Sequence, residues 1–276
     1  MNTFQRVIKY VAIGFAIFLT IVILSGIVSV AAGIVSVFDG EDKKRIEYSK
    51  DFSGIEQLDI NHKIGKLIVK SGSEFRVEAS NVSEDFRAEV VNNTLIIDEP
   101  DFMRKFLWFD FGTSRIKSSI TVYVPEDFNA TRIEIDSGAG TVDLEDLTTQ
   151  RLIINAGVGD VHGKNLTAMK VDAEGGVGNM NLVDVNFTDV SFDCGVGNIN
   201  VEGMIFGRSD FDCGVGNVHI RIKGQRDIYA LKVNSALGSV SVNGKKISRE
   251  YYDKYNSDNT LMISGGVGDV DIVFSH

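Results

Sequence analysis

The fold is decided by the stretch at residues 171–220, which reads VDAEGGVGNM NLVDVNFTDV SFDCGVGNIN VEGMIFGRSD FDCGVGNVHI. Within it, a small residue followed by Gly-Val-Gly-Asn recurs at a constant spacing, and the second glycines of the copies are Gly178, Gly197 and Gly216. The same spacing extends back to Gly159 and Gly140, with a period of about 19 residues. Two looser copies follow at residues 235–238 and 265–268, at longer intervals. A fixed period of this length is typical of stacked structural repeats.

Each repeat has the pattern of two short strands, each with one buried face. Apolar residues alternate with polar ones before the motif, as at Val190 and Phe192, and again after it, as at Ile199 and Val201. The Gly-x-Gly between them supplies the backbone freedom for a sharp corner. One repeat buries too few apolar side chains to offset the entropy of ordering its backbone, so neighbouring repeats must share their core. We therefore predict an all-β, β-solenoid-like stack of two-strand rungs, about 4.8 Å apart, with a period of ~19 residues.

The repeats belong to one β domain, which we predict over residues 46–276, irregular at 46–130 and regular at 131–276. Residues 62–65 (His-Lys-Ile-Gly), followed by Leu67 and Val69, have the pattern of a degenerate first copy. Alternating apolar residues predict the strands of the irregular part at Leu58–Ile60, Lys66–Lys70, Phe75–Ala79, Leu95–Ile97 and Ile120–Val124.

An uncharged, strongly apolar run extends from Val11 to Val37. As a helix, this run would span about 40 Å, which exceeds the roughly 30 Å hydrocarbon core of a bilayer. The alternative, a cleaved signal peptide, normally has an apolar segment of only about 7–15 residues. We predict an N-terminal tail and transmembrane anchor at residues 1–38 and a charged linker at 39–45.

The charge distribution bears on partners and on orientation. The chain has a formal charge of −10, and the part after residue 38 has a charge of −12. An acidic domain of this kind repels phosphates, which argues against nucleic acid as a partner. Basic residues on the two sides of the apolar run nearly balance, so the positive-inside rule gives little guidance. Because the leading tail is short, we expect a single-pass protein of the cell membrane, with a cytoplasmic N-terminus and an extracytoplasmic C-terminal domain.

Residues one period apart fall into columns of the predicted stack. One column combines an acid with three amides, which could hydrogen-bond along it as a structural ladder: Asp160, Asn179, Asn198 and Asn217. Another column contains three consecutive acids, Glu174, Asp193 and Asp212. Their carboxylates could hold a divalent cation between layers, or they could form a solvated acidic face screened by salt.

The two cysteines, Cys194 and Cys213, share a column in which every member is small. Adjacent layers would bring them close enough for a disulfide, and the expected compartment is oxidising. Side chains in register point the same way, however, which strains a disulfide and favours two packed thiols. Both alternatives stay open at this point.

Two segments stand out by their aromatic content and are candidate partner-binding sites. The first, at residues 101–111, also carries Arg104 and Lys105, and its aromatic candidates are Phe102, Phe106, Trp108, Phe109 and Phe111. The second, at residues 245–259, contains Tyr251, Tyr252 and Tyr255. Exposed aromatic patches mark interaction sites, but repeat folds also need caps that shield the ends of their core. Either role fits both segments.

An apolar helix, irregular strands and iterated small-Gly-Val-Gly-[Asp/Asn] units together resemble the bacterial "putative adhesin" or toastrack family. Membrane-anchored members of this kind resemble the Lia-type accessory proteins of envelope-stress operons. The resemblance covers about residues 46–276. It implies an all-β stack outside the cytoplasmic membrane, with no catalytic residues and no cofactor to carry over.

We therefore expect a non-enzymatic, membrane-anchored, adhesin-like protein that binds or scaffolds at the cell envelope. Its partner could be a wall polymer, another envelope protein or a second copy of itself, and the family resemblance suggests a role in envelope stress. One alternative is a polysaccharide-active β-solenoid enzyme that uses carboxylates such as Glu174 or Asp193. Another is a purely structural assembly module.

Overall fold

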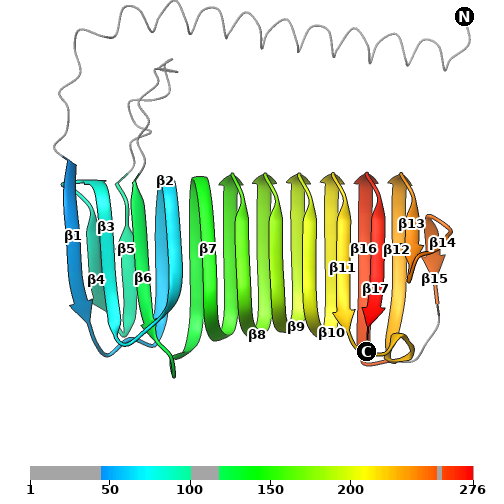
Figure 1. Cartoon of the computed structure of the whole chain (residues 1–276), viewed down its shortest axis with the longest axis horizontal. Coiled ribbons are helices and arrows are strands. Elements are labelled where there is room, and N and C mark those ends of the chain that lie inside the picture. Colours follow the sequence, from blue (N-terminus) through cyan, green and yellow to red (C-terminus); the bar gives the residue numbers. More distant parts are fainter. Residues whose placement is uncertain (1–44, 101–117, 254–256, 276) are drawn as a thin grey trace, which may run out of the picture. The chain divides into compact units, whose positions relative to one another are not determined.

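The computed structural model describes residues 45–100, 118–253 and 257–275 (Figure 1). These residues form one 17-stranded sheet, and the only helix among them is a single 3-10 turn at Arg226–Ile228. No helix in these three ranges has the length and apolar character needed to cross a membrane. The predicted anchor at 1–38 and the aromatic candidates at 102–111 lie outside the described residues.

Four long strands form the centre of the stack: β7 (Asn129–Val158), β8 (Val161–Val177), β9 (Met180–Val196) and β10 (Ile199–Val215). Each strand bends, so that it descends on one side of the stack and rises on the other (Figure 1). β8 pairs with β9 in parallel, with Val177 opposite Val196, and β10 pairs with β9 with Val215 opposite Val196. The predicted offset of one repeat between neighbouring layers is confirmed.

The core lies between the two sides of the stack and is filled by the alternating apolar residues. Phe192 and Phe211, which are in register, are fully buried and stack with ring centroids 5.2 Å apart. Buried residues of this kind continue from Ile55 to Ile272 as a single apolar cluster. Burial of this shared core is the main force that holds the layers together.

The Gly-x-Gly motifs form the corners where the rising side of a rung turns into the descending side. Gly178 has a φ of +148°, which side-chain-bearing residues rarely adopt. A Cβ at Gly178 would lie 1.8 Å from the carbonyl oxygen of Gly159 in the neighbouring layer. Glycine is therefore required here both by conformation and by the close approach of two backbones.

At one end of the stack, the order of layers departs from the order of the sequence. β2 (Gln57–Gly72) pairs with β7, with His62 opposite Ser137 and Gly65 opposite Gly140, which confirms the degenerate first copy. The layer outside β2 is formed by later residues, β5 (Thr94–Asp98) and β6 (Ser119–Pro125). Glu99, directly after β5, and Ser118, directly before β6, accept hydrogen bonds from the backbone N–H groups of Ile64 and Lys66 at the β2 corner.

Three antiparallel strands cover this end: β4 (Arg87–Val91) pairs with β5, β3 (Phe75–Ser83) with β6, and β1 (Arg45–Phe52) with β3. Antiparallel cover of this kind protects a sheet edge from pairing with other chains. Arg45, which the sequence analysis assigned to the linker, is the first residue of β1.

At the other end, two layers are exchanged relative to the sequence. β11 (Val218–Lys223) completes the last regular rung, and sequence order would place β12 (Tyr229–Leu237) and β13 (Val240–Val242) next. Instead β16 (Asn259–Val267) and β17 (Val270–Ser275) pair with β10 and β11, and β12 and β13 lie outside them. The exchange is possible because residues 224–228 can span about 16 Å, more than the separation of two layers.

Two short strands cover the outermost layer at this end. β15 (Glu250–Tyr252) pairs antiparallel with β12, and β14 (Lys245–Ile247) pairs antiparallel with β13. Within the described part of the chain, the segment at 245–259 therefore forms a cover for the open edge and the connection to β16.

Candidate interaction surfaces

The amide column beside the Gly-x-Gly corners is a hydrogen-bonded ladder, as predicted. The Oδ1 atom of Asp160 accepts hydrogen bonds from the backbone N–H and the Nδ2 atom of Asn179, both at 2.9 Å. The Oδ1 atom of Asn179 accepts in the same way from Asn198, and that of Asn198 accepts from the backbone N–H of Asn217 at 3.0 Å. Hydrogen bonds from Asn179 hold the pKa of Asp160 below its usual range. The ladder ties layers together and leaves few polar groups free for a partner.

The acidic column forms an exposed, flat face. Glu174 lies opposite Asp193, and Asp193 lies opposite Asp212, and all three are exposed. Partial desolvation, and then repulsion from Asp193 and Asp210, raise the pKa of Asp212. Among the residues that the structure describes, no three carboxylate, histidine or cysteine side chains converge on a point where a metal ion could bind.

More carboxylates extend this acidic face across the rising side of several layers. The acidic face as defined here comprises Asp59, Asp98, Glu134, Asp136, Asp172, Glu174, Asp193, Asp210 and Asp212. These residues come from β2, β5, β7, β8, β9 and β10, and the parallel register places them in two neighbouring columns. The result is a broad, negatively charged surface with no enclosed centre.

Both cysteines are free thiols. Cys194 and Cys213 lie opposite each other in adjacent layers, and both are buried. The Sγ atom of Cys213 donates a hydrogen bond to the carbonyl oxygen of Gly197 at 3.3 Å. Burial and then the proximity of Cys194 raise the pKa of Cys213 to about 12. A thiol with this pKa is a poor nucleophile, so the pair acts as packing.

Of the tyrosine candidates, Tyr251 and Tyr252 lie on β15, and Tyr255 lies outside the described residues. Tyr251 is half-buried and packs against the core opposite Val233 of β12. Tyr252 points outward and is 63% exposed. The covering role accounts for Tyr251, whereas Tyr252 is available to a partner.

A buried polar cluster, which the sequence analysis missed, lies at the corner of β2, next to the end of β5. The Glu99 carboxylate accepts hydrogen bonds from the backbone N–H groups of Lys63 and Ile64, at 2.8 and 3.3 Å. His62 is fully buried, its Nδ1 atom lies 3.2 Å from Ser137 Oγ, and its Nε2 atom lies 3.9 Å from Glu99 and has no hydrogen-bond partner. Glu99 thus supplies acceptors that a neighbouring Gly-x-Gly corner would otherwise provide.

This cluster contains the residue types of a hydrolytic triad, but its side chains are not accessible to a substrate. Ser137, His62 and Glu99 are all buried, with exposed fractions of 7%, 0% and 5%. Burial lowers the pKa of His62, which favours the neutral imidazole. Because no substrate could reach Ser137 Oγ, we assign the cluster a structural role. Its only sequence signal is an acid directly after a strand.

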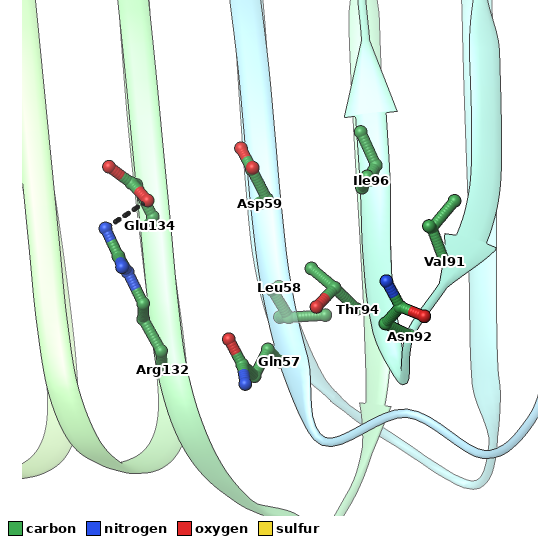
Figure 2. Close-up of a pocket in the computed structure, with 9 residues that line it drawn as sticks. All are labelled: Gln57, Leu58, Asp59, Val91, Asn92, Thr94, Ile96, Arg132 and Glu134. Atoms are coloured by element: carbon green, nitrogen blue, oxygen red, sulfur yellow. Dashed lines mark ion pairs between the residues drawn. The ribbon is translucent and has the colours of Figure 1, made fainter.

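A shallow cavity of about 260 Å³ lies on the outer surface of β2, β5 and β7. Figure 2 shows the ion pair between Arg132 and Glu134, 2.5 Å apart, at one wall, and Asn92 and Thr94 at the other. Burial, and then repulsion from Asp136, raise the pKa of Asp59 in this cavity. The lining offers polar groups to a ligand but no thiol, hydroxyl–imidazole pair or group of metal ligands.

The corners also carry a row of exposed apolar side chains, which we call the corner ridge. It consists of Ile64, Val158, Val177, Val196, Val215, Val267 and Leu237, each between 42 and 59% exposed. The parallel register places these residues in one column, with Ala139 between Ile64 and Val158. Alternation alone would turn Val177 inward with Val171 and Ala173; it lies outward because it stands at the turn itself, beyond the end of the core.

Several solved structures are similar to this chain at low sequence identity. A putative cell adhesion protein from Clostridium sporogenes has 17% sequence identity and a TM-score of 0.35, over 84% of this chain and 100% of that chain. "Putative adhesin" structures from Bacteroides fragilis and Parabacteroides distasonis have 17 and 12% identity and TM-scores of 0.43 and 0.46. These cover 84 and 85% of this chain and 98% of each of those chains. Similarity at this level supports no conclusion about function.

Comparison with curated proteins finds no match. The family model described as Toastrack DUF4097 matches residues 55–257, which include the degenerate first copy, the regular rungs and the exchanged layer of β12 and β13. The chain therefore belongs to the Toastrack DUF4097 family.

Proposed function

We propose that this chain is a non-enzymatic, membrane-anchored cell-surface protein whose β-repeat domain binds or scaffolds at the cell envelope. The apolar run from Val11 to Val37 supports the anchor, because it is long enough to cross a bilayer as a helix. Family membership supports a surface β-repeat protein. The resemblance to Lia-type proteins extends the proposal to a role in envelope stress.

The observation that carries the binding role is the acidic face. Its carboxylates are held in register by parallel strands, so the charge pattern is rigid and repeats from layer to layer. A patterned, mainly acidic surface favours an extended, positively charged partner, or one bridged through divalent cations, over a small substrate. Wall polymers and basic segments of envelope proteins have this chemistry.

The anchor and its orientation can be tested on the full chain in intact cells. Ser191 is exposed on the rising side of β9, so Ser191→Cys should react with a membrane-impermeant maleimide without permeabilisation. The native chain is the matched control, because Cys194 and Cys213 are buried and should not react. Labelling only after permeabilisation, or release of the protein by alkaline carbonate, would contradict the anchor or its orientation.

The binding surface can be tested by charge reversal. We expect the triple variant Glu174→Lys, Asp193→Lys and Asp212→Lys to sediment about tenfold less with isolated cell walls, a loss of about 1.4 kcal/mol. A control with the same charge change, Glu126→Lys, Asp127→Lys and Glu145→Lys, alters exposed acids elsewhere and should bind as the native protein does. Equal loss in both variants would indicate that net charge, and not the acidic face, governs binding.

A further inference from the structure

We infer that the corner ridge lies against the surface of the lipid bilayer, an inference that rests on the proposed membrane anchor. Counting Ala139, the ridge occupies eight corners in register, from Ile64 to Leu237. At about 4.8 Å per layer it extends for about 34 Å. Continuous rows of exposed apolar side chains mark interaction surfaces.

The corners that carry the ridge are almost free of charge, although the domain is strongly acidic. In the eight five-residue segments centred on the ridge residues and Ala139, the charged residues are Lys63, Lys66, Asp160 and Asp269. Their net charge is zero, whereas the chain after residue 38 has a charge of −12. An edge with only four charged side chains over eight layers incurs a smaller desolvation penalty at a hydrocarbon boundary than the acidic face would.

The path of the chain brings the same edge close to the predicted anchor. Arg45 lies opposite Ser83, and the register of β3 and β6 places this end of β1 at the level of Lys66, directly after the corner at Gly65. Only residues 38–44 separate the apolar run from β1, and seven residues span at most about 25 Å. An anchor in the bilayer therefore holds this edge, and not the opposite one, near the lipid.

The dimensions of the ridge favour lipid over a second copy of the chain. The two sides of the stack are about 10 Å apart, so the edge has an area of about 340 Å². A stable dimer buries roughly 800 Å² per partner, more than twice this area. A lipid surface needs no matching shape, and a short tether gives a millimolar effective concentration, so a weak contact is sufficient.

Quenching by brominated lipid tests this inference on the full chain. Trp108 is the only tryptophan, so Trp108→Phe gives a protein without tryptophan fluorescence. In this background, a tryptophan is placed on the ridge by Val196→Trp, with Val177→Trp as a second position in case one variant folds poorly. The matched control is Met169→Trp, an exposed apolar site on β8 that lies eight residues, about 26 Å, from the corner at Val177.

Each variant is reconstituted into phosphatidylcholine vesicles with or without bromine on the acyl chains. We expect ridge emission to fall by roughly half in brominated vesicles, because the ring would lie at the boundary of headgroups and acyl chains, and control emission to stay unchanged. Equal quenching of ridge and control, or no quenching of either, would overturn the inference. Ridge emission that depends on protein density but not on bromine would assign the ridge to a second copy and would also overturn it.

Sedimentation after an alkaline carbonate wash separates the two proposals. If the protein stays with the vesicles but its ridge tryptophan is not quenched, the membrane anchor is supported and only the inference about the corner ridge is wrong. If the protein is washed off, the proposed membrane anchor is wrong, and the inference that depends on it is wrong as well.

Discussion

Each rung has two corners at which the chain reverses direction, and the two corners are built from different residue types. At the Gly-x-Gly corner, Gly178 and Gly197 have φ values of +148° and +149°, and a Cβ would lie 1.8 or 1.7 Å from a carbonyl oxygen of the next layer. At the opposite corner, Asp146, Asn165 and Asp184 have φ values of 53–56°, the left-handed helical region that Asn and Asp tolerate. At the Gly-x-Gly corner, the backbone requires glycine on both sides of one apolar residue. At the opposite corner, the backbone accepts polar and charged side chains.

This difference explains why the two edges of the stack carry different surfaces. At the opposite corner, the Nδ2 atom of Asn165 donates to Asp146 Oδ1 at 2.7 Å, and Asp184 lies 2.7 Å from Lys223 Nζ. At the Gly-x-Gly corner, the residues between the glycines point outward and form the corner ridge. The backbone geometry therefore gives the two edges different side chains, mainly apolar ones at the Gly-x-Gly corner and mainly polar or charged ones at the opposite corner.

The largest effect should come from adding a methyl group at the tight corner. Gly178→Ala would force apart two backbones that are in contact, and we expect a loss of about 4 kcal/mol in the free energy of unfolding. Gly244→Ala is the matched control, because Gly244 has a positive φ of +72° but no atom within 4 Å of its Cβ position. We expect it to cost only about 1–2 kcal/mol.

Urea denaturation of the detergent-solubilised chain, followed by circular dichroism, measures both variants. Similar losses in the two variants would mean that conformational strain, and not contact between layers, makes glycine necessary at the corner.

A smaller loss of stability is expected from breaking the amide ladder, and a still smaller one from a change at the opposite corner. Asn198→Ala removes the acceptor of the backbone N–H of Asn217, and we expect a loss of about 1–2 kcal/mol. Asn165→Gly supplies the same left-handed conformation without a side chain and should change stability by less than about 0.5 kcal/mol. The same urea titration compares them; a greater loss from Asn165→Gly would reverse the assignment of the ladder as the stabilising element.

The buried histidine at the modified corner should make stability depend on pH. Burial lowers the pKa of His62 below its ordinary 6.5, so the unfolded chain takes up a proton before the folded chain does as the pH falls. Stability is therefore unaffected by His62 above pH 6.5 and decreases below it, by at most about 1.4 kcal/mol per pH unit.

Urea midpoints measured between pH 7.5 and 5.5 reveal this slope. We expect His62→Gln to flatten it, whereas His162→Gln, at an exposed position of β8, should retain it. A slope that persists in His62→Gln would assign the pH dependence to other groups.

The smallest effect should come from the cysteine column beside the corner. Cys213→Ala should cost about 1 kcal/mol or less, because Ala156 and Gly175 occupy the same column in other layers. In the native chain, neither Cys194 nor Cys213 should react with a thiol reagent at pH 8 until urea unfolds the domain. Rapid reaction of the folded protein would show that the column opens.

Much of the central stack could be predicted because the sequence repeats what the structure repeats. The constant interval between copies specified which side chains are neighbours, so the core column of Phe192 and Phe211, the amide ladder and the pair of cysteines could be read from it. The exposure of Val177 could not, because alternation describes a strand and Val177 stands where the strand turns. The cluster of His62 and Glu99 was also missed, since it replaces a corner and repeats nowhere.

The sequence by itself determined the period, the register between regular layers and the all-β class, because identical spacing produces identical local geometry in every layer. Only the tertiary structure decided the order of layers at the two ends, where β5 and β6 lie outside β2 and the layer of β16 and β17 precedes that of β12 and β13. The physical reason is that a parallel ladder requires matching register but not consecutive sequence. Which strand covers an open edge depends on the length of the connection that leads to it, and the periodic pattern of the sequence does not specify that length.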